Sequence, residues 1–406
     1  MDTPQAPETL HTRCCIVGGG PAGIMLGFLL ARQGIDVVVL EKHADFLRDF
    51  RGDTIHPSTL ELMNELGLLD EFLSRPHQEA QSVSLRIGDS MLKLGDFSHL
   101  PTRCKFIVFM PQWDFLDFLV DQAGANPHFH LRMQAEAVDL IREGGRVCGV
   151  RVATPDGPLE VRADLVVAAD GRRSLVREKA GLAVLDIGAP MDVLWMRISR
   201  LPSDPGNLLG HIEAGRMLVM IDRDEYWQCA YLIPKGSLDA VQQAGLAVFR
   251  QDVALLAPFL GTRVEEIRSW DDVKLLTVTV DRLKQWFQPG LLCIGDAAHA
   301  MSPIGGVGIN LAIQDAVATA NILGPLLRHG PVGPEKLALV QKRREWPTRL
   351  TQRFQVLVQK RLIDPVLRSS GDVSAPWVIR MLARWPWFRR IPARLIGIGF
   401  RPEHIR

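Results

Sequence analysis

The sequence predicts an α/β fold with a parallel sheet, an inserted antiparallel sheet and a helical C-terminal part. Short continuous apolar runs are typical of parallel strands that are buried on both faces. These runs occupy residues 14–17, 35–40, 164–169 and 291–294. Residues 185–281 instead carry several strand-like runs around one helical stretch. Residues 341–406 are basic and helical in pattern. The parallel sheet is therefore interrupted by other material.

Composition limits the function classes. The chain has 406 residues, 47% of them hydrophobic, and a net charge of +1, which argues against nucleic acid as a partner. Its six cysteines form no CxxC pair, so we expect neither a disulfide framework nor a metal site. We find no apolar signal segment and no spanning run, and we therefore expect a cytoplasmic protein.

The stretch 13–41 carries the strongest local pattern. An apolar run is followed at once by the glycine motif Gly18-Gly19-Gly20-Pro21-Ala22-Gly23, then by an apolar helix and a second strand that ends at Glu41. Gly18 allows a tight turn, Gly20 leaves room for a pyrophosphate, and Gly23 lets the helix approach the strand. The helix N-terminus attracts phosphates, and a carboxylate at Glu41 can bind a ribose. This pattern predicts a Rossmann-like dinucleotide site.

The elements between the glycine motif and the second sheet follow from local signals. The main signals for a helix are a proline in its first turn and a glycine after its end. The signal for a hairpin is Gly-Asp between two alternating runs. We expect a helix at 57–66, a hairpin at 81–94, a strand at 104–110, a helix at 112–123 and short strands over 128–161.

The parallel pattern returns towards the end of the chain. The strand at 164–169 ends at Asp170-Gly171, and the strand at 291–294 ends at Gly295-Asp296. A Pro/Gly loop at 301–308 then precedes a long apolar helix at 309–327. We also expect a helical stretch at 237–257 within the inserted part.

These patterns predict three parts. The nucleotide-binding domain is discontinuous, and a second domain is inserted into it. The predicted ranges are 1–78, 105–184 and 282–340 for the first domain, 79–104 and 185–281 for the second, and 341–406 for a basic helical C-terminal segment.

Three motifs occur in order, each at a strand end: GGGPAG at 18–23, ADGRRS at 169–174 and GDAAHAMSPIGGVGIN at 295–310. Together they make residues 10–330 resemble the class A, single-component FAD monooxygenases typified by p-hydroxybenzoate hydroxylase. The resemblance implies a GR2-type FAD-binding domain with an inserted substrate domain.

The resemblance also implies roles for particular residues. Pro303 lies over the reactive face of the flavin, Asp296 binds its ribitol, and Arg51 and Gln112 reach its phosphates and ribitol; Pro303, Asp296 and Arg51 are the predicted catalytic group. The full set of implied cofactor residues is Gly18, Gly20, Pro21, Ala22, Gly23, Glu41, Lys42, Arg51, Gln112, Asp170, Gly171, Gly295, Asp296, Gly305, Gly306, Val307, Gly308, Ile309 and Asn310. Val307 departs from the family pattern, which often has glutamine there.

The implied activity is hydroxylation of an apolar, aromatic small molecule. FAD is the cofactor, NADPH or NADH the transient reductant, and a flavin C4a-hydroperoxide formed with O₂ the oxygen donor. The substrate is expected between the flavin and the inserted sheet. The candidate substrate residues are Trp195, Arg197, Met220, Tyr226, Trp227 and Tyr231.

Several alternatives stay open. The same scaffold serves flavin-dependent halogenases and isoprenoid reductases, and the chain could be a non-catalytic FAD-binding protein. Lys342 to Arg406 holds fifteen lysines and arginines against four acidic residues. This basic segment could lie on an anionic membrane, but packing of the helices on the FAD domain is the favoured interpretation. The protein is expected to be a monomer or a homodimer.

Overall fold

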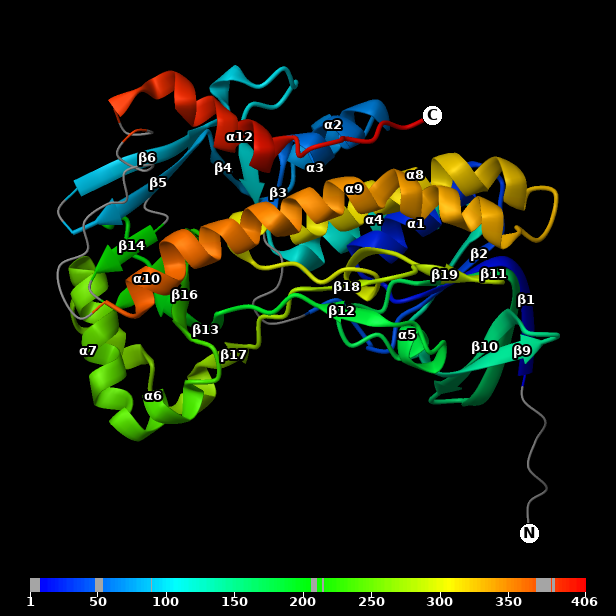
Figure 1. The fold of residues 1–406 in the computed structure, drawn as a ribbon, viewed down its shortest axis with the longest axis horizontal. Coiled ribbons are helices and arrows are strands. Elements are labelled where there is room, and N and C mark those ends of the chain that lie inside the picture. The colour runs from blue at the N-terminus through cyan, green and yellow to red at the C-terminus, as the bar shows by residue number, and fades with distance from the viewer. Residues whose placement is uncertain are drawn as a thin grey trace, which may run out of the picture.

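The computed structural model describes residues 8–47, 54–88, 90–205, 210–213, 215–369, 381 and 384–406. Two large sheets lie towards opposite ends of the molecule, and helix α9 runs lengthwise between them (Figure 1). The fold is α/β, as predicted.

The first sheet has eight strands in the order β19-β20-β11-β1-β2-β8, with β10 and β9 joined beside β11. The pairs β20–β11, β11–β1, β1–β2 and β2–β8 are parallel, so their carboxyl ends meet at one edge. The strands are β1 Glu8–Val17, β2 Val37–Leu40, β8 Phe129–Arg132, β9 Glu136–Glu143, β10 Arg146–Thr154, β11 Gly157–Ala168, β19 Phe287–Gln288 and β20 Leu291–Cys293.

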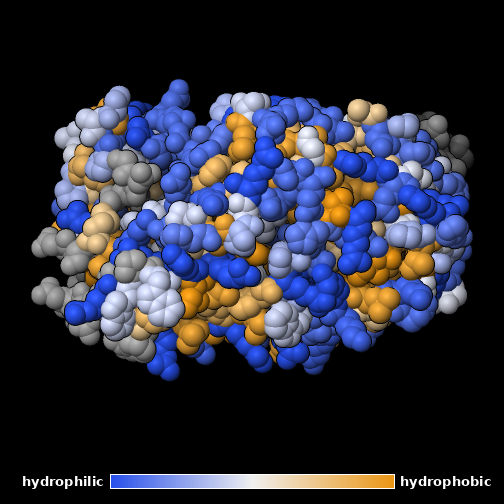
Figure 2. All heavy atoms as spheres, turned by 90° about the horizontal axis from the view of Figure 1, so that it is seen from above, coloured by the Kyte–Doolittle hydropathy of each residue, from blue (hydrophilic) through white to orange (hydrophobic). Residues whose placement is uncertain are grey.

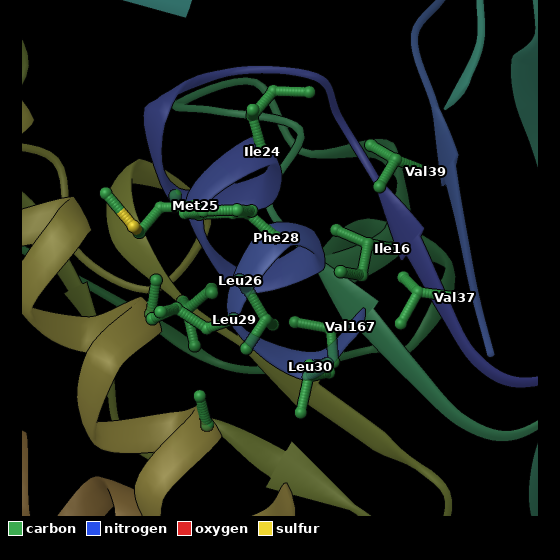
Figure 3. Close-up of a cluster of buried hydrophobic side chains, with 14 of the residues drawn as sticks. Ile16, Ile24, Met25, Leu26, Phe28, Leu29, Leu30, Val37, Val39 and Val167 are labelled. Carbon is green, nitrogen blue, oxygen red and sulfur yellow. The ribbon is translucent and has the colours of Figure 1, made fainter. Parts of the chain in front are cut away.

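Helix α1 (Pro21–Arg32) is buried along nearly its whole length because it packs between this sheet and helix α8 (Gly308–Leu327). Figure 3 shows Ile24 and Phe28 of α1 beside Ile16 and Val39 of the neighbouring strands. A helix covered on both sides is hydrophobic all round, which explains the unbroken apolar sequence of α1.

The second sheet has seven strands in the order β17-β13-β16-β15-β14-β5-β6. It joins strands from residues 82–96 with strands from residues 191–276, through a parallel pairing of β5 with β14. The strands are β5 Ser82–Ile87, β6 Ser90–Asp96, β13 Met191–Ser199, β14 Gly210–Glu213, β15 Arg216–Asp222, β16 Tyr226–Pro234 and β17 Lys274–Leu276.

One face of the second sheet is covered by α6 (Leu238–Ala244) and α7 (Leu246–Leu256). The helical stretch predicted at 237–257 is thus two helices, separated at Gly245, whose φ of +96° breaks the helix. The opposite face of the sheet is also apolar and turns towards the interior of the molecule.

The C-terminal residues are helical and lie along the rest of the molecule. Helix α9 (Pro334–Val358) packs on α8 and continues through a π-helical turn, η6 (Gln359–Ile363), into α10 (Asp364–Leu367). Helix α12 (Arg390–Gly397) lies on β6 and on the short helix η1 (Phe97–His99). The smaller elements are β3 Thr54–Ile55, α2 Pro57–Glu65, α3 Leu69–Leu73, β4 Gln78–Ala80, β7 Ile107–Phe109, α4 Gln112–Gly124, α5 Leu175–Lys179, β12 Val184–Asp186 and β18 Asp281–Leu283. The other short helices are η2 Pro258–Glu266, η3 Trp270–Asp272, η4 Gly295–Ala297, η5 Ile304–Gly306 and η7 Pro386–Arg389.

The face of the molecule that carries α12 and α2 shows hydrophobic residues in separate groups among hydrophilic ones (Figure 2). Among the described residues, no helix combines the length and apolar character needed to cross a bilayer.

Candidate active site

A cavity of about 1710 Å³ lies between the carboxyl edge of the parallel sheet and the apolar inner face of the second sheet. We call the part lined by Gly18–Ala22, Glu41–His43 and Asp170–Arg173 the glycine end. The part lined by β13, β15 and β16 is the sheet end. The loop 301–306 and the first turn of α8 line the cavity as well.

The turn after β1 is tightly constrained. Gly18 has a φ of +109° and donates its N–H to the carbonyl of Leu40 at 2.8 Å; a Cβ there would lie 2.4 Å from the carbonyl oxygen of Ala169. A Cβ on Gly23 would lie 1.9 Å from the carbonyl oxygen of Gly18. At Gly20, by contrast, a Cβ would meet no atom within 4 Å. Two glycines are therefore needed by the turn itself, and Gly20 leaves open space at the start of α1.

Glu41 is held in place by backbone donors. Its Oε2 accepts from the N–H of Gly19 at 3.0 Å, and its Oε1 accepts from the N–H of His43 at 3.1 Å. The side chain is buried and lines the cavity. Each oxygen of an ionised carboxylate can accept more than one hydrogen bond, so the group can still receive a ligand hydroxyl.

Asp170 and Asp296 stand at the ends of neighbouring strands. Asp170 accepts from the N–H of Val176 through Oδ2, and burial raises the pKa of Asp170 above its ordinary value. In the described part of the chain its Oδ1 is buried without a hydrogen-bond partner. The carboxylate of Asp296 lies 3.5 Å from Nη2 of Arg172. Asp170 thus presents an acceptor that a ligand could use.

The glycine-rich loop is anchored by one buried asparagine. Gly305 and Gly306 have φ of +76° and +62°, which few other residues adopt. Asn310 donates to the carbonyls of Thr54 and Gly306 at 3.0 and 3.3 Å and accepts from the N–H of His56 at 2.8 Å. Thr54 also donates to the Gly306 carbonyl at 2.9 Å. These bonds fix the loop against the segment that begins at residue 54.

A buried ionic network supports the turn before Asp296. Asp315 accepts from the N–H of Gly295 at 3.1 Å, lies 2.5 Å from Nε2 of His299 and pairs with Arg344 at 2.9 Å. Arg344 in turn pairs with Glu403 at 3.2 Å. Burial by itself raises the pKa of Asp315, but His299 and Arg344 lower it below its ordinary value. The carboxylate stays charged and holds the turn.

Comparison with known proteins identifies the fold that carries this site. Residues 11–353 match the family described as FAD binding domain. The chain is also 32% identical over 409 residues to 6-methylpretetramide 4-monooxygenase from Streptomyces rimosus, and the alignment covers 99% of this chain and 96% of that protein. The chain belongs to the FAD binding domain family. It is an FAD-dependent monooxygenase of the p-hydroxybenzoate hydroxylase-like class A.

Two solved structures have a similar fold. Anhydrotetracycline hydroxylase from Streptomyces rimosus aligns with a TM-score of 0.75 and 24% identity, over 96% of this chain and 76% of that one. The p-nitrophenol 4-monooxygenase from Pseudomonas putida DLL-E4 aligns with a TM-score of 0.74 and 21% identity, over 97% and 100%. At these identities the two structures show the shared fold alone.

The cavity of this FAD binding domain fits the cofactor. Gly20 with its open space, the anchored Glu41 carboxylate and Asp170, whose Oδ1 has no hydrogen-bond partner among the described residues, line one chamber. These are the features needed by a pyrophosphate, a ribose and a further hydroxyl or amide donor. The residues that would hold FAD are thus present at the edge where the fold places them.

Most of the cofactor residues predicted from the sequence line the cavity. Those that do are Gly18, Gly20, Pro21, Ala22, Glu41, Lys42, Gln112, Asp170, Gly171, Asp296, Gly305, Gly306, Gly308 and Ile309. Pro303, predicted as catalytic, lines the cavity as well. Gly23, Gly295, Val307 and Asn310 do not line it and support its walls instead. The prediction for Arg51 lies outside the described residues.

The structure places the predicted substrate residues in different surroundings. Of the six predicted, only Trp195 lines the cavity. Met220, Trp227 and Tyr231 point to the opposite face of the sheet and pack against α7 and its neighbours. Arg197 is exposed, with its guanidinium 4.9 Å from the centre of the half-buried ring of Tyr226. The cavity wall is formed by the alternate residues Met191, Val193, Trp195, Met217, Val219, Ile221, Ala230 and Leu232.

Sequence analysis also missed the contribution of the C-terminal segment. Residues of η6 and α12 line the sheet end of the cavity, among them Leu362, Ile363, Ile391 and Ile396. Nδ1 of the buried His56 lies 2.7 Å from the carbonyl oxygen of Ile396, which ties α12 to the glycine-rich loop. The high apolar content of residues 387–398 was the available signal.

Proposed function

We propose that this monooxygenase hydroxylates a polycyclic, phenolic aromatic compound of the pretetramide type. The observation that carries the proposal is the size and lining of the cavity. Its volume of about 1710 Å³ exceeds the roughly 300–1,000 Å³ of a pocket for one drug-sized ligand. A chamber that holds FAD at the glycine end therefore has room for a second large ligand beneath β13, β15 and β16.

The chemistry of the sheet end supports an apolar, flat ligand. The eight wall residues that alternate along β13, β15 and β16 are apolar, and Trp195 provides an aromatic surface for stacking. The relative with 32% identity is named for a pretetramide, which agrees with this interpretation. We infer that the inserted sheet binds the substrate and that the glycine end binds the cofactor.

FAD, when bound and reduced by NADPH or NADH, supplies the chemistry that activates O₂, and one oxygen atom of O₂ passes to the substrate. The protein positions the cofactor and the substrate and excludes water. Glu41 and Asp170 are proposed to hold the ribose and a further polar group of the cofactor. The N-terminus of α8 at Gly308 faces the cavity and stabilises negative charge there. Closure of the sheet end by α12 keeps water from the reacting atoms.

The test uses the purified FAD-loaded protein with tetracyclic, tricyclic and monocyclic phenols. NAD(P)H oxidation, O₂ consumption and peroxide release are followed together, and products are analysed by mass spectrometry. We expect the tetracyclic phenols to stimulate oxidation with little peroxide and to gain one oxygen atom.

Stimulation by monocyclic phenols alone would contradict the polycyclic substrate class. If NAD(P)H consumption always equals peroxide release, hydroxylation itself is contradicted. A parallel reaction with halide and a separate flavin reductase tests halogenation, and a halogenated product would replace the proposed function.

A further inference from the structure

A second hollow, of about 480 Å³, lies between α9 and β18, and none of the residues that line it belongs to the three motifs described above. Arg282 of β18 lines it from one side, and side chains of α9 and η6 line it from the other, where α9 crosses the front of the molecule above β12 and β18 (Figure 1). We call this hollow the basic pocket. Its polar lining residues are Arg282, Arg349, Gln352, Arg353, Lys360 and Arg361.

The positive charge of the basic pocket is largely uncompensated. Across the described ranges, Glu345 is the one carboxylate within salt-bridge distance of these five cations, 3.7 Å from Arg349. Burial together with the positive charges of Arg349 and Arg353 lowers the pKa of Arg282. Like charges at i and i+4 of a helix repel each other, so Arg349 and Arg353 gain from a bound anion.

The basic pocket is connected to the loop 301–306 through two buried glutamines of α9. Gln352 accepts from Nη1 of Arg282 at 2.9 Å and donates to the carbonyl oxygens of Asp281 and Ala300, at 2.7 and 3.2 Å. One turn later, Gln355 donates to the carbonyls of Ser302 and Ile304, at 2.8 and 2.9 Å. Helix α9 thus carries cations of the basic pocket and also holds the loop around Pro303.

The two hollows also share part of their walls. Leu357 and Arg361 line both the basic pocket and the cavity of the active site. The phosphates of FAD have their own place at Gly20 and the N-terminus of α1, at the glycine end. An anion in the basic pocket is therefore a different ligand, bound next to the chamber where the flavin reacts.

We propose that the basic pocket binds the phosphate groups of the nicotinamide nucleotide and selects NADPH over NADH. This inference rests on the proposed function, in which such a nucleotide reduces the flavin. Five cations and one carboxylate leave about four positive charges. The pyrophosphate of either nucleotide carries about two negative charges, and the 2′-phosphate, present in NADPH alone, adds about 1.5 to 2 more. The charge of the pocket matches NADPH.

Guanidinium groups are also the preferred partners of phosphate oxygens because their N–H groups form paired hydrogen bonds. Four of the five cations are arginines, contributed by β18, α9 and η6. A transient co-substrate must enter and leave during each turnover, and a solvent-facing pocket beside the flavin chamber permits this.

The experiment titrates the FAD-loaded protein with adenosine 2′,5′-bisphosphate by calorimetry, with 5′-AMP and inorganic phosphate as comparison ligands. The variant is Arg353→Gln, which removes one exposed charge of the pocket, and Lys360→Gln is a second. The matched control is Lys342→Gln, an exposed lysine of the same helix that does not line the pocket.

We expect Arg353→Gln and Lys360→Gln each to raise the Kd of the bisphosphate about tenfold, and to raise the KM for NADPH by a similar factor. The KM for the aromatic substrate, the flavin content and the behaviour of Lys342→Gln stay unchanged. The wild-type protein binds 5′-AMP and inorganic phosphate at least tenfold more weakly than the bisphosphate.

Equal binding of inorganic phosphate and the bisphosphate would overturn selection of a nucleotide. Two results would contradict the assignment of the basic pocket as the nucleotide site. One is a changed KM for the aromatic substrate alone, and the other is unchanged binding of the bisphosphate in both variants. Failure of the proposed function gives a distinct result. The bisphosphate would then still bind in an Arg353-dependent manner, although no aromatic compound stimulates NADPH oxidation.

Discussion

The two ends of the active-site cavity are built in different ways. At the glycine end, consecutive residues at the ends of parallel strands turn into the cavity, as in the run from Gly18 to Ala22. At the sheet end, alternate residues of antiparallel strands form the wall, and α12 and η6 add side chains from far along the sequence. The first end depends on backbone shape and the second on which face each strand presents. We therefore expect substitutions at the two ends to affect different properties of the protein.

The largest expected effect separates the two faces of the second sheet. Trp227 is buried, packs near Phe259 and donates from Nε1 to Asp204 at 2.8 Å. We expect Trp227→Ala to lower the free energy of unfolding by about 3–5 kcal/mol, measured by urea denaturation. The matched change on the cavity face, Trp195→Ala, should raise the KM for the aromatic substrate roughly tenfold, about 1.4 kcal/mol, with a smaller loss of stability. The reverse pattern would mean that the faces are misassigned.

The second prediction concerns His56, which joins the glycine-rich loop to α12. Burial lowers its pKa to about 4, although the nearby carbonyls of Ile396 and Gly305 favour the protonated form and oppose the shift. The folded protein therefore keeps His56 neutral while the unfolded chain takes up a proton near its ordinary pKa. The contribution of neutral His56 to the free energy of unfolding is fully present above about pH 6.5. It decreases towards pH 4, by at most about 1.4 kcal/mol per pH unit.

The variant His56→Asn keeps a donor for the Ile396 carbonyl and removes this titration. Denaturation curves at several pH values should show a shallower fall for the variant than for the wild-type protein. His211 titrates in the same range, because burial and Arg86 lower its pKa to about 4, so the variant retains part of the slope. Equal slopes in the two proteins would contradict the role given to His56.

The third prediction addresses backbone shape at the glycine end. A methyl group at Gly20 meets no protein atom within 4 Å, and the φ of −78° suits alanine. We expect Gly20→Ala to fold normally but to bind FAD at least tenfold more weakly, about 1.4 kcal/mol, as measured by flavin fluorescence. Gly124→Ala, at another open glycine with ordinary φ, is the control and should retain FAD. If Gly20→Ala binds FAD as tightly as the wild-type protein, the pyrophosphate does not bind at Gly20.

The smallest effect is expected at Arg197, at the outer end of β13. Its guanidinium stacks on Tyr226 outside the cavity. Arg197→Gln should change the KM for any aromatic substrate less than twofold and lower stability by about 0.5–1 kcal/mol. A large rise in KM for an anionic substrate would restore the role that the sequence suggested for this residue.

The same contrast explains what the sequence can predict. The glycine motif, Glu41, Asp170 and Asp296 are found from local spacing because each follows a strand of the parallel sheet directly. On β13, by contrast, Leu194 and Met196 face α7 while Val193 and Trp195 face the cavity. Both faces are apolar, so polarity does not tell which residues meet the substrate. Large aromatic side chains were predicted to bind the substrate, and two of them, Trp227 and Tyr231, lie on the face that α7 covers.

Long-range ion pairs were beyond prediction for another reason. The buried pairing of Arg344 with Glu403 and Asp315 joins three distant stretches of chain, and none of them carries a local motif for it. In the sequence, Arg344 is one of six basic residues on this helix, and nothing in its local pattern distinguishes it from exposed ones such as Lys342 and Arg349. Only the packing of α9 on α8 singles it out.

This ionic network has a consequence for biogenesis. Glu403 receives both Arg343 and Arg344, and Arg344 holds the Asp315 carboxylate that anchors Gly295. The ribosome adds Gly295 long before Glu403, and domains form progressively during synthesis. The turn that carries Asp296 thus gains its full support only after residue 403 has emerged. If FAD binding requires this turn, flavin loading follows the synthesis of the C-terminal residues.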